Sequence, residues 1–84
     1  MTNGEALEEV RRRLAIDLEQ LWVDYVGLGG SASPRSIEAY LRGERDFERG
    51  QHDALAQAIN ECAMERGLNH PAPYDDELRD GGER

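Results

Sequence analysis

The sequence predicts an all-α fold, a small three-helix domain with a long first helix, a short second helix and a medium third helix. Apolar residues recur every three or four positions over most of the chain, which is the period of an amphipathic helix. Stretches that contain glycine separate these periodic runs and mark helix ends. A chain of 84 residues is the size of a single domain, which we assign to residues 1–74.

The first helix is expected to continue to about Leu28. Its apolar residues follow one face of a 3.6-residue period, at Leu7, Val10, Leu14, Leu18, Leu21, Tyr25 and Leu28. In its second half, Trp22, Val23 and Val26 widen this apolar stripe beyond what one neighbouring helix would cover. These three residues are the candidate interaction surface, because exposed apolar patches often mark interfaces. The alternative is that the third helix of the same chain covers them.

The stretch GLGGSASP, residues 27–34, is expected to reverse the chain and begin the second helix. One of its glycines can adopt the left-handed conformation that ends a helix. Ser33 then caps the second helix and Pro34 occupies its first turn, and this helix is expected to run to about Arg42. The literal match of this stretch to a dinucleotide-binding glycine motif carries no weight, since no strand precedes it and no sheet can follow.

The third helix is expected to follow a turn over residues 43–50 and to end at Gly67, with Phe47 filling the core from the turn. The prolines of NHPAPY, residues 69–74, forbid helix and predict an extended strap along the helices. Residues 75–84 have almost nothing to bury and are expected to form a flexible acidic tail.

Composition argues against several functions. The formal net charge is −8, every basic residue is an arginine, and no part of the chain is basic overall, so nucleic-acid binding is disfavoured. A single cysteine, the lack of a long apolar run and the lack of a signal-peptide pattern predict a cytoplasmic protein that does not enter a membrane. Acidity favours a basic protein partner.

Metal binding and catalysis are also disfavoured. The spacing of His52, Cys62 and His70 does not suit a zinc site, and His52 and Cys62 would lie about 80° apart around one helix. Cys62 is therefore expected to be a core residue, and His52 to lie at the start of a helix or to be half-exposed. No catalytic residue, metal ligand or cofactor is predicted.

Two resemblances follow from longer strings. LWVDYVGLGGSASPRSIEAYLRG, with HDALAQAINE and HPAPY after it, resembles a group of short uncharacterised helical proteins of actinobacteria over residues 21–74. That resemblance implies a compact helical module and no activity.

More weakly, SPRSIEAYLRGERDFERGQHDALAQAINE is similar to the recognition helix and following helix of repressor-like helix-turn-helix proteins. That similarity implies DNA contacts from Arg35, Ser36, Arg42 and Arg45. The net charge opposes it, as does the expected single long helix in place of a short preceding one. The sequence therefore predicts a small acidic non-enzymatic regulator or adaptor that binds a protein or itself, with a DNA-binding regulator as the alternative.

Overall fold

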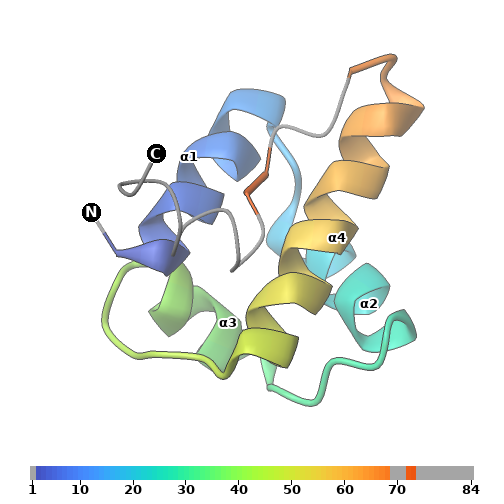
Figure 1. Cartoon of the computed structure of the whole chain (residues 1–84). Helices are drawn as coiled ribbons and strands as arrows, with labels where there is room; N and C mark the ends of the chain where they lie inside the picture. The colour runs from blue at the N-terminus through green and yellow to red at the C-terminus, as the bar shows by residue number, and fades with distance from the viewer. Residues whose placement is uncertain (1, 69–71, 74–84) are drawn as a thin grey trace, which may run out of the picture.

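The computed structural model describes residues 2–68 and 72–73, which form four helices and no strand. The helices are α1 (Asn3–Leu14), α2 (Leu18–Gly27), α3 (Pro34–Leu41) and α4 (Arg49–Glu65). α4 packs against α1 and α2, and each of these also packs against α3 (Figure 1). The all-α class is confirmed, but the three-helix prediction is wrong, because the expected long first helix is two helices.

The chain turns out of the first helix at Ala15, which adopts a left-handed conformation with φ of 55°. Asp17 then caps α2 by accepting hydrogen bonds from the backbone nitrogens of Glu19 and Gln20. Between them lies Ile16, which is outside the predicted apolar stripe and yet only 2% exposed. The break brings Ile16 into the core, whereas a continuous helix would point it away from the stripe.

Arg11 stabilises this break from the last turn of α1. Its guanidinium donates to both carboxylate oxygens of Glu8, at 2.6 and 2.8 Å, and to the carbonyl oxygen of Ile16 at 2.7 Å. The hydrogen bond from Arg11 lowers the pKa of Glu8. The arginine therefore satisfies a backbone carbonyl that lies just past the helix end.

All four helices end in the same way. A left-handed residue is followed by a residue whose backbone nitrogen donates to the carbonyl five positions back, which is the Schellman arrangement. The left-handed residues are Ala15, Gly29, Gly43 and Gly67, and the donors are Ile16, Gly30, Glu44 and Leu68. Three of these ends carry the expected glycine, and the one that does not is the helix end that sequence reading missed.

Replacing Ala15 with glycine is expected to raise the free energy of unfolding by about 1 kcal/mol, because the left-handed conformation strains a residue that has a Cβ. Ala39→Gly, within α3, is the matched control and should lower stability by about 0.5–1 kcal/mol. Urea denaturation measures both. If Ala15→Gly lowered the free energy of unfolding as much as Ala39→Gly does, Ala15 would not be in the left-handed conformation that ends α1.

The other elements follow their sequence signals more closely. α3 begins at Pro34, and the side chain of Ser33 accepts a hydrogen bond from the backbone of Ser36. Phe47, in the connection to α4, is half-buried and stacks on Tyr40 with ring centroids 4.2 Å apart. The connection between α3 and α4 is therefore held on the core by an aromatic pair.

Ala72 and Pro73, which we name the strap, lie between α1 and α4 (Figure 1). Ala72 is 2% exposed, and both its backbone nitrogen and its carbonyl oxygen pair with the side-chain amide of Asn60. The rest of the predicted strap, residues 69–71 and 74, and the predicted tail, residues 75–84, lie outside the described residues.

Candidate functional site

The outer face of α2 carries a row of apolar side chains. Leu18, Trp22 and Val26 are spaced four residues apart and therefore follow one another along the helix, with Val23 one turn before Val26. Leu18 and Trp22 are half-buried, whereas Val23 and Val26 are 52% and 43% exposed. Leu21 and Tyr25 form the buried face of the same helix. We name Trp22, Val23 and Val26 the α2 surface.

The three residues of the α2 surface differ in how far the rest of the chain covers them. The intramolecular core covers part of Trp22 but leaves both valines largely in solvent. Their exposure is what an interaction surface requires.

Trp22 is held in place by the loop that follows α2. Its indole nitrogen donates to the carbonyl oxygen of Ala32 at 3.1 Å. The fully buried Tyr25 anchors the same loop, because its hydroxyl accepts from the backbone nitrogen of Ala32 at 2.9 Å and donates to the side-chain oxygen of Gln51 on α4. That oxygen also accepts from the backbone nitrogen of Ser31 at 3.0 Å. The loop between α2 and α3 is therefore fixed to the core by side chains from two helices.

A groove of about 700 Å³ lies between the first turns of α2 and α3. It is lined by Leu18, Glu19, Trp22, Ser33, Pro34, Arg35, Ile37 and Glu38. Trp22 belongs to the predicted interaction surface and Arg35 to the alternative DNA-contact set, so the groove brings together residues that the sequence analysis assigned to different functions. Glu19 and Glu38 give it two carboxylates beside one guanidinium.

Cys62 lies close to α2 on the α4 side. Its thiol donates to a carboxylate oxygen of Asp24 at 3.5 Å. Burial raises the pKa of the Cys62 thiol, and the contact with Asp24 raises it further. The thiol therefore stays protonated at neutral pH and is a core group, as the sequence predicted, and not an activated nucleophile.

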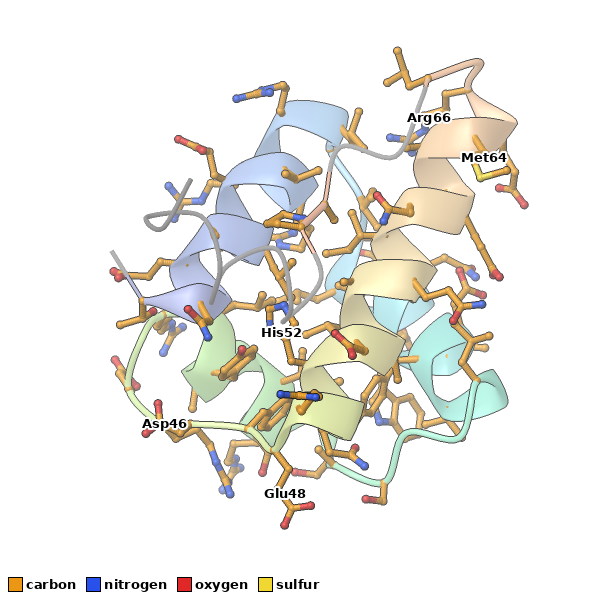
Figure 2. All side chains as sticks on the ribbon, viewed as in Figure 1. Asp46, Glu48, His52, Met64 and Arg66 are labelled. Carbon is orange, nitrogen blue, oxygen red and sulfur yellow. The ribbon has the colours of Figure 1, made fainter. Side chains whose placement is uncertain are left out.

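The other residues of the alternative DNA-contact set are engaged within the chain. Arg45 donates to the hydroxyl of Ser36 at 2.8 Å, and Arg42 pairs with Glu38 at 2.7 Å. In Figure 2, Asp46 and Glu48, one and three positions after Arg45, project outward from the connection between α3 and α4. Arg35 is exposed at the start of α3. The break at Ala15 also supplies a short helix before α3, so the expected single long helix is wrong, while the glycine-containing loop of residues 28–33 still separates α2 from α3.

His52 lies in the first turn of α4, in line with the predicted helix-start position, but the half-exposed alternative is wrong, since only 1% of the residue is accessible. Figure 2 places it near the middle of the molecule. Its Nε2 lies 3.0 Å from the carbonyl oxygen of Pro73, and its Nδ1 pairs with the hydroxyl of Tyr40. Within residues 2–68 and 72–73, no three histidine, cysteine or acidic side chains are grouped to hold a metal ion.

The helices of the described ranges are too short or too polar to cross a membrane. Comparisons of the chain with protein-family models, with curated proteins and with solved structures gave no match. The α2 surface and the adjoining groove are therefore the features that support a functional proposal.

Proposed function

We propose that this chain is a small, acidic, non-enzymatic regulator or adaptor that binds another protein, or a second copy of itself, through the α2 surface. The observation that carries the proposal is the exposure of Val23 and Val26, at 52% and 43%, beside a tryptophan that lines a groove. Tryptophan is among the residues that contribute most to binding energy at interfaces. A partner that covers the valines would bury apolar area now in contact with water.

The charges favour a basic partner. The chain carries a formal net charge of −8, and Glu19 and Glu38 line the groove beside Trp22. Opposite charge on a partner speeds encounter and selects orientation more than it adds affinity. The proposal includes a cytoplasmic setting, which is supported by the single cysteine, since one cysteine cannot form a disulfide within the chain.

The first experiment is light scattering after size-exclusion chromatography, over a range of protein and salt concentrations. Self-association through the α2 surface predicts that Val23→Glu shifts the dimer to a 9.5 kDa monomer, because a carboxylate in an apolar contact must lose its water. Met64→Glu is the matched control, since Met64 on α4 is also 52% exposed and should tolerate the change.

If the chain is monomeric throughout, a photo-crosslinking residue at position 23 tests for a different partner, with position 64 as its control. A crosslinked product that forms at position 23 alone and is lost in Trp22→Ala supports the proposal. A monomer that gives equal products at both positions, or none, contradicts it.

DNA binding is the second candidate, and one observation favours it. α2 and α3 are consecutive helices that pack against each other and are joined by the loop of residues 28–33. Arg35 is exposed at the start of α3. The acidic charge and the pairing of Arg42 with Glu38 oppose it. This candidate requires duplex binding that weakens steeply with salt and is lost in Arg35→Ala combined with Arg42→Ala, while Val23→Glu leaves it unchanged.

A further inference from the structure

The strap is bound through its main chain. The amide nitrogen of Asn60 donates to the carbonyl oxygen of Ala72 at 3.0 Å, and the backbone nitrogen of Ala72 donates to the amide oxygen of Asn60 at 2.7 Å. His52 supplies a third contact, from its Nε2 to the carbonyl oxygen of Pro73 at 3.0 Å. We name His52 and Asn60 the strap site. Its polar atoms recognise backbone groups that any chain segment could present.

His52 is held by one hydrogen bond with the core and one with the strap. A carbonyl oxygen only accepts, so Nε2 carries the proton toward Pro73 and Nδ1 accepts from the hydroxyl of Tyr40. Tyr40 is itself buried and stacks on Phe47. The contact with Tyr40 therefore aims Nε2 of His52 at the carbonyl group of the strap.

The side chains of the strap define which segments fit. Ala72 is 2% exposed and belongs to the main core cluster, so this position admits only a small side chain. Pro73 restricts the residue before it to extended conformations and has no backbone N–H that would need a partner. A small residue followed by proline, in an extended chain, meets both conditions.

The site also requires an occupant. Asn60 and His52 are each 1% exposed, and every buried side-chain nitrogen and oxygen in the described part of the chain has a hydrogen-bond partner. Without the strap, the amide of Asn60 and Nε2 of His52 would lose those hydrogen-bond partners and would need water or another chain segment in their place. Nothing in the three contacts depends on the strap belonging to the same chain as the site.

We propose that the strap site is a recognition site for an extended segment of a small residue followed by proline, and that it binds this segment of a second copy in trans as well as its own in cis. Exchange of identical elements between copies is a low-cost route to dimers, because the same contacts form within one chain and between two. Main-chain hydrogen bonds with one small pocket are also the basis of extended-peptide recognition by sheet edges.

The experiment uses two full-length variants that each lack one half of the contact. Ala72→Glu has an intact site and a strap that no longer fits, whereas Asn60→Ala has an intact strap and a defective site. Both carry Val23→Glu, so that association through the α2 surface cannot be mistaken for strap exchange. Light scattering after size-exclusion chromatography is expected to find monomers of each variant alone and a heterodimer, of twice 9.5 kDa, in the mixture.

Circular dichroism first establishes that both variants are helical. If both variants are folded and the mixture stays monomeric at millimolar concentration, the proposal is overturned. The intact strap of Asn60→Ala would then not bind the intact site of Ala72→Glu.

A second design covers the case in which Ala72→Glu does not fold. A protease site is inserted between Leu68 and Asn69 of the otherwise natural chain and is cut in the folded protein. A fluorescent peptide of residues 69–84 should then exchange with the cleaved segment, and the same peptide with Ala72→Glu should bind at least about tenfold more weakly. Equal binding of the two peptides, or no exchange, would show that the strap site does not recognise the segment in trans.

Discussion

Replacing Gly4 with alanine is expected to lower the free energy of unfolding by about 3 kcal/mol, which is among the largest effects of any single-methyl addition to this protein. A Cβ at Gly4 would lie 1.9 Å from the backbone oxygen of Tyr40 and 2.7 Å from its carbonyl carbon. Neither atom belongs to a flexible side chain, so α1 must move away from α3. Since each kcal/mol shifts the melting temperature of a domain this size by roughly 4–8 °C, thermal unfolding will resolve the change easily.

Gly27→Ala is the matched control for this prediction. A Cβ at Gly27, in the last turn of α2, meets no atom within 4 Å. The control should be neutral or more stable by up to about 1 kcal/mol, because alanine has less freedom to lose on folding. Wild-type stability in Gly4→Ala would mean that α1 and α3 do not approach as closely as the structure has them.

Tyr25→Phe is expected to lower the free energy of unfolding by about 2 kcal/mol although it removes a single oxygen atom. That oxygen joins the side chain of Gln51 to the backbone nitrogen of Ala32, and it lies on a residue with no exposed area. The change leaves both groups without this partner and loosens the loop that holds Trp22. Urea denaturation measures the loss, and emission from Trp22, the single tryptophan of the chain, reports the loop.

A double-mutant cycle separates this network from simple loss of packing. Gln51→Ala also removes the acceptor for Ser31, so the two single changes disturb the same loop. The double variant should lose less free energy of unfolding than the two single variants lose in sum, with a difference of about 1 kcal/mol. Strict additivity would mean that the tyrosine and the glutamine act on the loop independently.

Sequence reasoning located three of the four helix ends because glycine marks them. Gly29, Gly43 and Gly67 all have positive φ, and the residues after them close the expected hydrogen bonds. At the fourth end an alanine takes the same conformation, and the step from Leu14 to Leu18 continues the helical period across the break. The missed signals were Asp17, a good N-cap, and the isolated apolar Ile16.

The candidate site was predictable in its residues and not in its geometry. The excess of apolar residues at the end of the first stripe identified Trp22, Val23 and Val26, of which the two valines are exposed. The groove that joins Trp22 to Arg35 depends on how α2 and α3 pack, which no local pattern records.

The strap shows the same limit of local patterns. The prolines predicted that residues 69–74 are not helical. No pattern near Asn60 predicted that its side chain would bind the backbone of Ala72, twelve positions later. Such a pair becomes visible only when α4 and the returning chain are placed side by side.

The strap also has a consequence for how the molecule opens. Amide protons close to the end of a chain usually exchange with solvent rapidly, because terminal segments fray independently of the rest. The amide proton of Ala72 is instead donated to a buried side chain of α4. Its exchange with deuterium therefore requires the strap to separate from Asn60, so the exchange rate of this one amide reports how often the strap leaves α4.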